Sequence, residues 1–479
     1  MISIRLFASF LLILQYGSFN AQQSIEEEIL KIVGDESAQN TIYGVSVIDV
    51  DGLVRVSMND KSLFMPASTM KVITTFTGLG QLGDDFRFTT SLYSKGELTD
   101  DGTLHGDLII RGSGDPSLGS PGYPSAQALD QVMFSFIEFV EEAGIKCVTG
   151  ELIIDIASFE KRFIHPSWSW DDLTNYYASG STSVNIHENF YYIDFNRSNL
   201  PDQSTSISTV RPKVPALTID NFVKTGPLKS GDNAYIYGSP YDESRWIEGT
   251  IPPGQGNFTI KGAVPDPVAF FGSLFVEYLR KRNINIGGYQ KSTEIEYSNH
   301  IGTIYSDPLI DLAQFANYKS NNLFCEAIYN MLGLKFEGIA SFSSGAAAVT
   351  NYLEKYELPS SQITSSDGSG LSWRNRISPK MLSSFLFHES KIGGIDRIKH
   401  LLPQAGSEGS VRNFMKGSLV ANRLWLKSGS INNVQCYTGL LQAKSGAYFL
   451  ITLMANGHRS NSRMRSIHAD VINVLYSHL

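Results

Sequence analysis

The stretch Pro66-Ala-Ser-Thr-Met-Lys-Val-Ile-Thr-Thr-Phe-Thr-Gly-Leu-Gly-Gln-Leu82 predicts a helix. It has proline near its start, apolar residues recurring on one face, and two glycines near its end. Ser68 and Lys71 are three positions apart, so they share a helix face and the lysine amine can reach the serine hydroxyl. A serine needs such a partner to act as a nucleophile at neutral pH. The apolar neighbours would bury Lys71 and lower its pKa.

The Ser-x-x-Lys spacing is weak evidence by itself, because Ser158-Phe-Glu-Lys161 also matches it. Ser158 ends a strand-like stretch in open, charged sequence, whereas Ser68 begins an apolar helix. We therefore prefer Ser68 as a nucleophile, with a helix cap as the alternative. A Gly-x-Gly-x-x-Gly string at 78–83 follows a helix instead of opening one after a strand, so we interpret it as a helix end and turn.

Outside this helix, strand and helix patterns near both ends of the sequence predict a single α/β framework. Residues 43–58 alternate between apolar and polar and turn at Asp51-Gly52, which is typical of a β-hairpin. The other expected elements are antiparallel strands at 423–430, 434–442 and 448–454 and helices at 266–282, 309–334 and 460–475.

Between these ends, residues from about 86 to 265 alternate in short stretches separated by Gly, Pro, Asp and Ser clusters. These short alternating stretches, separated by turn residues, predict a β-rich insertion. We expect a signal peptide at 1–21, a catalytic domain made of 22–88 and 265–479, and one or two inserted β-rich domains at 89–264.

The amino-acid composition argues against several classes of protein function. The 479 residues suffice for about three domains, and the 42% hydrophobic content can fill a sizeable core. A net charge of -8 without a basic block argues against nucleic-acid binding. The three cysteines (Cys147, Cys325 and Cys436) are too few for a disulfide scaffold or a four-cysteine zinc site, and we expect them to be small buried hydrophobes. The nine histidines show no ligand spacing, so we expect no metal and no cofactor.

The N-terminus predicts export. A basic residue within 1–5, an apolar run at 6–14 and a small residue at Ala21 are typical of a secretory signal peptide. Phe19 occupies a place where a small residue is preferred, so the cleavage site stays open. The run is shorter than the roughly 20 residues that span a membrane, and no later run approaches that length, so we expect an exported protein without a membrane span.

Two further elements follow Ser68-x-x-Lys71 along the chain: Ser320-Asn-Asn322 before a helical stretch and Lys427-Ser-Gly429 at the end of a strand. In this order the three elements resemble those of the penicillin-binding serine peptidases. The sequence is most similar to the class C low-molecular-mass penicillin-binding proteins, which are D-alanyl-D-alanine carboxypeptidases and endopeptidases.

The third element has competitors at Lys224-Thr-Gly, Lys229-Ser-Gly and Lys444-Ser-Gly. The first two precede Ser320 and lie in turn-like sequence, and Lys444 lies in the turn of a later hairpin. Lys427 alone ends a strand, is followed by another strand and comes last in the required order, so we choose it although Ser428 replaces the family's common threonine.

The resemblance extends over nearly the whole mature chain. It includes 106–116 (Gly-Asp-Leu-Ile-Ile-Arg-Gly-Ser-Gly-Asp-Pro), 168–173 (Trp-Ser-Trp-Asp-Asp-Leu) and 367–372 (Asp-Gly-Ser-Gly-Leu-Ser). The family usually has arginine directly after the last motif, whereas this chain has Trp373 and then Arg374. If the family arginine helps to hold substrate, the resemblance implies that its role here passes to Arg374 or is lost. The implied fold is a β-lactamase/transpeptidase-like domain, an antiparallel sheet with helices on both faces, interrupted by the insertion.

The resemblance also implies roles. Ser68 would attack the peptide carbonyl, Lys71 would accept the serine proton, and Ser320 would pass a proton to the leaving amine. Asn322 would bind the amide of the substrate. Asp172, five residues before an aromatic residue, would hold the free side-chain amine of the stem peptide, with a solvated turn carboxylate as the alternative reading.

The segment Lys427-Ser428-Gly429-Ser430 would complete the site. Lys427 and Ser428 suit a carboxylate of the substrate or of a β-lactam, and the backbone N–H groups of Ser68 and Ser430 would form an oxyanion hole. The implied partners are peptidoglycan stem peptides and β-lactam antibiotics, encountered in the periplasm. The alternatives are a β-lactamase or esterase, and a non-catalytic peptidoglycan-binding protein, on the same fold.

Overall fold

The computed structural model describes residues 25–34 and 40–479, so the predicted signal peptide lies outside the described residues. The chain forms two compact units. The first comprises the described residues up to Thr77 together with 313–320 and 349–479, and the second comprises 78–312 and 321–348. Compared with the domain limits expected from sequence, the second unit extends beyond 89–264 at both of its ends. None of the helices in the described ranges is long and apolar enough to cross a membrane.

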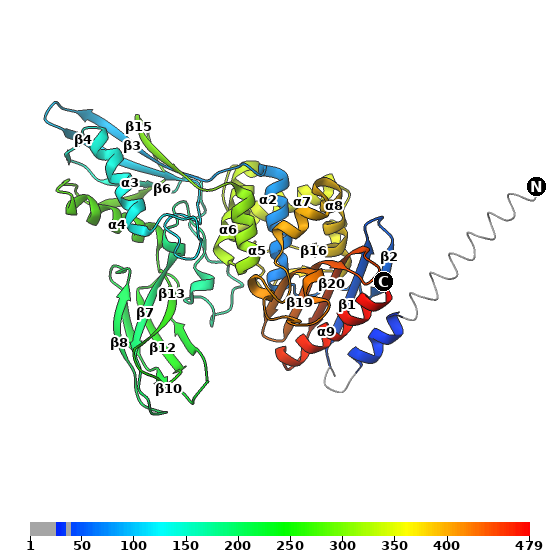
Figure 1. The fold of residues 1–479 in the computed structure, drawn as a ribbon. Helices are drawn as coiled ribbons and strands as arrows, with labels where there is room; N and C mark the ends of the chain where they lie inside the picture. The colour runs from blue at the N-terminus through cyan, green and yellow to red at the C-terminus, as the bar shows by residue number, and fades with distance from the viewer. Residues whose placement is uncertain (1–24, 35–39) are drawn as a thin grey trace, which may run out of the picture. The chain divides into compact units, whose positions relative to one another are not determined.

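The first unit is built on a five-stranded antiparallel sheet in the order β18-β19-β20-β1-β2. Its strands come from both ends of the sequence, as predicted (Figure 1). They are β1 (Ile42–Asp49), β2 (Val54–Met58), β18 (Leu424–Ile431), β19 (Val434–Gln442) and β20 (Tyr448–Asn456).

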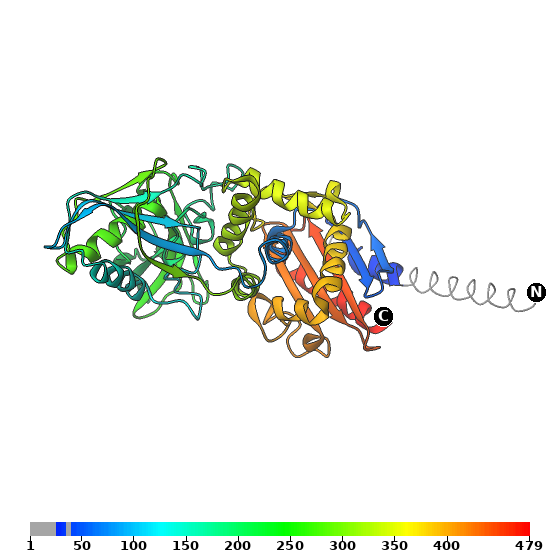
Figure 2. The same cartoon turned by 90° about the horizontal axis from the view of Figure 1, so that it is seen from above.

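Helices cover both faces of this sheet, because alternate residues of a strand point to opposite sides. Val45 and Val47 of β1 pack in one apolar cluster with residues of α9 (Asn461–His478). Ser46, between them, points the other way, and its hydroxyl lies 2.6 Å from that of Ser383 on α8 (Pro379–Leu401). Figures 1 and 2 show α8 and α9 beside the strands. The expected α/β framework with helices on both faces is confirmed.

Four polar residues form one row across the face of the sheet that carries α8. Lys427 on β18 pairs with Thr438, Thr438 pairs with Thr452, and Thr452 pairs with Ser46. Directly paired residues of neighbouring strands lie on the same face. The strand register therefore directs Lys427 to the α8 side of the sheet, whereas its neighbour Leu426 packs in the cluster that includes α9.

The helix expected at 66–82 consists of a 3-10 turn at Ala67–Thr69 followed by α2 (Met70–Leu82). The helical stretch expected at 309–334 is two helices, α5 (Leu309–Lys319) and α6 (Asn322–Glu337). They are separated at Ser320, whose φ of 55° lies in the left-handed region. A non-glycine residue there cannot continue a right-handed helix.

The second unit contains three further sheets. One has the strand order β14-β6-β4-β3-β15, with β5 beside β4; the second has the order β13-β7-β8; the third places β10, β11 and β9 against β12. Their bounds are β3 (Thr89–Leu98), β4 (Thr103–Gly112), β5 (Cys147–Val148), β6 (Leu152–Asp155), β7 (Phe190–Asn196), β8 (Ser206–Arg211), β9 (Thr218–Asn221), β10 (Lys224–Thr225), β11 (Asn233–Tyr237), β12 (Ser244–Ile251), β13 (Asn257–Ala263), β14 (Tyr289–Ser292) and β15 (Asn299–Tyr305).

Two helices pack into the core of this unit. The expected helix at 266–282 is α4 (Pro267–Lys281), which begins with an Asp266 side-chain cap. The other, α3 (Leu129–Glu142), was not predicted within the β-rich insertion. It buries residues spaced three and four apart, including Val132, Phe136 and Val140, in one cluster with α4. Other elements include α7 (Phe342–Lys355) and the short strands β16 (Ile363–Thr364) and β17 (Arg376–Ile377).

Candidate active site

The serine at the start of α2 is held in a strained turn. Ala67, which precedes Ser68, has a φ of 46°, a left-handed conformation that costs free energy in a residue with a side chain. Lys71 is completely buried, and its Nζ donates to Ser68 Oγ at 2.9 Å and to the backbone oxygen of Ser369 at 2.5 Å. The predicted serine–lysine pair is thus within hydrogen-bond distance.

The oxygen that receives Lys71 belongs to a loop built by the motif at 367–372. The buried carboxylate of Asp367 accepts hydrogen bonds from the backbone N–H groups of Gly370 and Ser372 and from Nδ2 of Asn375. These bonds fix the loop in the conformation that presents the Ser369 oxygen. From the sequence, this motif is only a point of resemblance to the family, whereas in the structure its loop supports Lys71.

Strand β18 lies directly against the turn that carries the serine. A Cβ added at Gly429 would lie 2.5 Å from the backbone oxygen of Pro66 and 3.1 Å from the backbone nitrogen of Ser68. Both are backbone atoms that cannot swing away. Glycine is therefore required here by the close approach of two backbone segments.

A second lysine–serine pair lies in the same unit. Lys427 is completely buried, and its Nζ donates to Ser320 Oγ at 2.9 Å and to the Ser428 oxygen at 2.7 Å. The hydroxyl of Ser428 lies 3.0 Å from that of Ser410. Ser430 is exposed at the end of the strand, and its hydroxyl accepts from the amide of Asn461. The structure thus brings Ser320 and Lys427 together in one unit, as the resemblance implied.

The look-alike motifs have different surroundings. Lys224 and Lys444 are exposed, the first on the short strand β10 and the second in the turn between β19 and β20. Lys229 lies in a turn with a φ of 65°. Ser158 lies in the loop after β6, and Lys161 is exposed.

In the second unit, Asn322 and Asp172 are linked through one tyrosine. Asn322 Nδ2 donates to the backbone oxygen of Tyr177 at 2.7 Å, and the Tyr177 hydroxyl donates to Asp172 Oδ1 at 2.9 Å. Burial raises the pKa of Asp172 above its usual value and Asp171 adds to this, while the Tyr177 hydrogen bond acts in the opposite direction. The same burial and the neighbouring carboxylate raise the pKa of Tyr177.

Comparison with known proteins identifies the family. A profile of the D-Ala-D-Ala carboxypeptidase 3 (S13) family matches residues 25–477. The chain belongs to this family. The expected family, fold class and general activity of a penicillin-binding D-Ala-D-Ala carboxypeptidase are thereby confirmed.

Individual S13 relatives are distant in sequence. The chain is 26% identical over 414 residues to the D-alanyl-D-alanine carboxypeptidase DacB of Haemophilus influenzae, covering 84% of this chain and 82% of the relative. It is 24% identical over 460 residues to a D-alanyl-D-alanine carboxypeptidase of an Actinomadura species, covering 91% and 81%. The crystal structure of penicillin binding protein 4 from Haemophilus influenzae shares the fold, with a TM-score of 0.81 and 23% identity over 94% of this chain and 99% of that one.

Directly after the 367–372 motif, where the resemblance predicts an arginine, this chain has Trp373. Trp373 and Arg374 are both exposed, and the Arg374 guanidinium lies 5.4 Å from the centre of the Trp373 ring.

Of the three cysteines, Cys325 and Cys436 are buried and Cys147 is partly exposed. The expectation that all three are buried is therefore wrong for Cys147.

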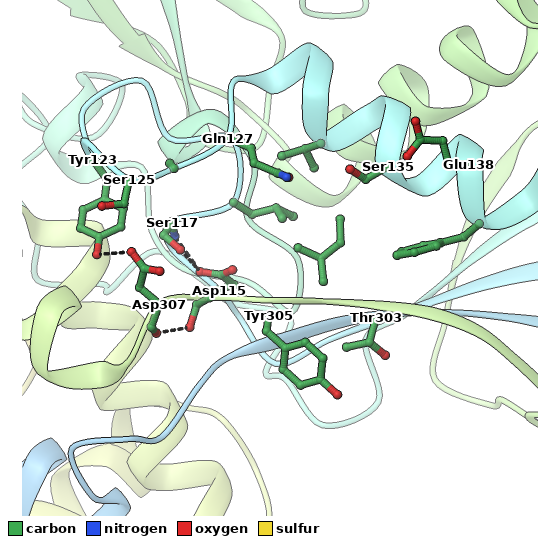
Figure 3. A pocket seen from close by; sticks show the side chains of 17 residues that line it. Asp115, Ser117, Tyr123, Ser125, Gln127, Ser135, Glu138, Thr303, Tyr305 and Asp307 are labelled. Carbon is green, nitrogen blue, oxygen red and sulfur yellow. Dashed lines mark hydrogen bonds between the residues drawn. The ribbon is translucent and has the colours of Figure 1, made fainter.

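The motif at 106–116 leads into a polar cavity of about 390 Å³ in the second unit. Figure 3 shows its lining side chains, with the Ser117 hydroxyl turned to Asp115 and the Tyr123 hydroxyl turned to Asp307. Burial raises the pKa of Asp115 to about 6. None of the predicted site residues lines this cavity, and two of its carboxylates, those of Asp115 and Asp307, accept from hydroxyl groups of the same lining.

Proposed function

We propose that the protein hydrolyses peptidoglycan stem peptides that end in D-Ala-D-Ala, and also the cross-links between stems, through an acyl-enzyme on Ser68. The observation that carries this proposal is the pair of buried lysines, each bonded to a serine of a different motif: Lys71 to Ser68 and Lys427 to Ser320. Burying a charged or polar amine is costly unless it has partners, so two such pairs indicate chemistry more than stability.

In the acylation step, Ser68 Oγ forms a bond to the carbonyl carbon of the penultimate D-alanine. Its proton passes to Nζ of Lys71, which lies within hydrogen-bond distance and acts in its neutral form. The C–N bond then breaks as Lys71 returns this proton, relayed by the Ser320 hydroxyl, to the leaving amine, which departs. Water completes the cycle by hydrolysing the ester, which releases the shortened peptide and restores the serine.

Charge on the substrate is accommodated by the segment that begins at Lys427. The Lys427 amine and the Ser428 hydroxyl bind the terminal carboxylate, and Asn322 binds an amide of the stem peptide. Backbone N–H groups of Ser68 and Ser430 stabilise the oxyanion, a contribution of about 2.7 to 4 kcal/mol per donor in acyl-transfer sites. The close approach at Gly429 supports this arrangement, because it sets β18 against the turn of the nucleophile.

The inserted segment contributes the contact with the side chain of the substrate. Asp172 holds the free ammonium of the stem peptide. Its carboxylate accepts a hydrogen bond from the Tyr177 hydroxyl, and burial raises its pKa. Since cross-linked peptidoglycan and β-lactams are met outside the cytoplasm, we also propose that residues 1–21 direct the protein to the periplasm. No metal or cofactor takes part in the proposed reaction.

Mass spectrometry after incubation with benzylpenicillin tests the proposal. We expect a covalent adduct on the peptide that contains Ser68, no adduct in Ser68→Ala, and an unchanged adduct in the matched control Ser158→Ala. Labelling that persists in Ser68→Ala and disappears in Ser158→Ala would contradict the assignment. A long-lived adduct together with D-alanine release from muropeptides supports a peptidase, whereas rapid loss of the adduct without peptide cleavage indicates a β-lactamase.

A further inference from the structure

Three consecutive residues of the second unit, none of them glycine, turn in the left-handed sense. His187, Glu188 and Asn189 have φ angles of 55°, 53° and 55°. All three are nearly inaccessible, with 7%, 7% and 0% of their surface exposed. A left-handed run brings each Cβ close to the next carbonyl oxygen, so such a turn persists only where its surroundings hold it in place.

The turn is held by a buried network of side-chain amides. Asn189 Nδ2 donates to the backbone oxygen of Gly180 at 3.0 Å and to Oδ1 of Asn185 at 2.7 Å. Asn185 Nδ2 in turn donates to the backbone oxygen of Gly114 at 2.9 Å. Gly114 belongs to the family-like motif at 106–116, to which the proposed reaction gives no role. That motif therefore helps to maintain the strained turn.

The strained turn directs the Glu188 carboxylate at the residue between Ser320 and Asn322. Oε1 accepts from the hydroxyl of Ser120 at 2.5 Å and from the backbone N–H of Gly122 at 3.1 Å. Oε2 accepts from Asn321 Nδ2 at 2.8 Å. The carboxylate thus has three partners, two on one oxygen and one on the other, and only Asn321 belongs to the Ser-x-Asn motif.

Asn321 is fixed from two sides. Its Nδ2 donates to Glu188, and its Oδ1 accepts from the backbone N–H of Phe324 at 3.3 Å, which caps α6. The side chain cannot rotate by half a turn without placing nitrogen where α6 needs an acceptor. Glu188 therefore determines the orientation of Asn321, and Asn321 begins the helix whose first residue is Asn322.

We infer that Glu188 is a positioning residue for the Ser-x-Asn motif: it fixes Asn321 and so sets the direction in which Asn322 presents its amide to the substrate. This inference rests on the proposed function, since it assumes that Asn322 binds substrate. Glu188 itself touches no reacting atom. It transmits the conformation of the inserted segment to the motif through one charge-assisted hydrogen bond.

A polarity swap provides the test. In Glu188→Gln, one oxygen can still accept from Ser120 and Gly122, but the new amide nitrogen faces the nitrogen of Asn321, and two donors cannot pair. In Asn321→Asp, the cap of α6 is kept, but two carboxylates face each other. The double variant Glu188→Gln/Asn321→Asp restores one donor and one acceptor at that contact while keeping the cap and the Ser120 contact.

The rate of acylation by benzylpenicillin, kcat and KM on a diacyl-D-Ala-D-Ala peptide, and the melting temperature are measured for all four proteins. We expect each single variant to lower kcat/KM by about 10- to 100-fold, the cost typical of a misplaced substrate contact. The double variant should recover most of this loss, because the restored pair couples the two positions. A residue that only supports the fold would lower the melting temperature and leave kcat/KM of the folded fraction unchanged.

A matched control is Glu389→Gln. Glu389 is another buried carboxylate of the first unit; it lies on α8 and accepts from the hydroxyl of Tyr352 on α7. This variant should change the melting temperature without changing kcat/KM. Wild-type kcat/KM in Glu188→Gln, or a double variant no more active than the single variants, would overturn the inference. Failure of the proposed function is distinguishable, because the wild-type protein itself would then form no adduct at Ser68.

Discussion

Replacing Asp172 by Asn should remove the recognition of a charged side chain and leave the acylation machinery intact. The substitution keeps the size of the side chain and an oxygen that can accept from the Tyr177 hydroxyl, which lies 2.9 Å from the carboxylate. It removes the negative charge. Burial raises the pKa of this carboxyl, so the free protein holds the charge at a cost in free energy that a bound ammonium offsets.

The size of the effect follows from the kind of contact. A hydrogen bond between a carboxylate and an ammonium contributes about 1.5 to 3 kcal/mol. Its loss should lower kcat/KM by roughly 10- to 150-fold, since about 1.36 kcal/mol corresponds to tenfold. The loss is expected for stem peptides with a free side-chain amine. Peptides whose amine is acetylated, and penicillins without one, should react with Asp172→Asn as they do with the wild type.

Stability should change in the opposite direction to activity. The pKa of Asp172 is higher in the folded protein than in the unfolded chain, so the folded state binds more protons in the interval between the two values. Stability from this group therefore falls as pH rises through that interval and stays reduced at neutral pH. Asp172→Asn removes this penalty, so its melting temperature at pH 7 should equal or exceed that of the wild type.

Kinetics on a matched pair of peptides, with free and acetylated side-chain amines, decide the role of Asp172. Tyr177→Phe serves as a second probe: it removes a hydrogen bond that favours the ionised carboxylate, so discrimination between the peptides should appear at a higher pH. Equal losses on both peptides, accompanied by a lower melting temperature, would mean that Asp172 supports the fold. Unchanged kinetics on both would identify a solvated carboxylate.

The other predictions concern the first unit. Lys427→Ala should reduce penicillin acylation at least about 100-fold, because it removes the proposed partner of the substrate carboxylate and the hydrogen-bond partner of Ser320. Lys224→Ala and Lys444→Ala change exposed lysines and should acylate normally; equal damage from Lys224→Ala would refute the choice of Lys427. Gly429→Ala should also impair acylation severely, since its Cβ would lie 2.5 Å from a backbone oxygen; a normal acylation rate would show that β18 can move away. Burial raises the pKa of Glu389 to about 7, so the folded protein binds this proton more tightly than the unfolded chain does. The free energy of unfolding, measured with urea, should therefore fall by on the order of 3 kcal/mol between about pH 4.5 and 7. Glu389→Gln should lack this pH dependence.

Local patterns in the sequence were sufficient to predict much of the first unit. Alternation and turn residues gave the strands of the sheet, and Ser68 and Lys71 meet because a separation of three places side chains on one face of a helical turn. The choice of Lys427 among four similar tripeptides also relied on local context. The pairing of its strand with β19 explains why that context matters, because the register turns Lys427 to the same face as Ser46 and α8.

Features that depend on distant contacts were not predictable in this way. Ala67 and Ser320 adopt left-handed conformations that neither residue type favours, so local propensity does not predict them. The Ser369 oxygen reaches Lys71 only because Asp367 folds its loop, nearly 300 positions away in the chain. Helix α3 did have a helical spacing of apolar residues, but the surrounding Gly, Pro and Ser clusters favoured a β-rich interpretation of the whole segment.

Tyr177 shows why the insertion is expected to take part in the reaction. Its hydroxyl holds the carboxylate proposed to recognise the substrate side chain, and its backbone oxygen holds the amide of Asn322. A second buried group, Glu188, holds the neighbouring Asn321. Both amides of the Ser-Asn-Asn motif are therefore oriented by residues of the inserted segment. Since Tyr177→Phe removes the hydroxyl and leaves the backbone oxygen in place, it should alter side-chain discrimination without the general loss of acylation expected for Glu188→Gln.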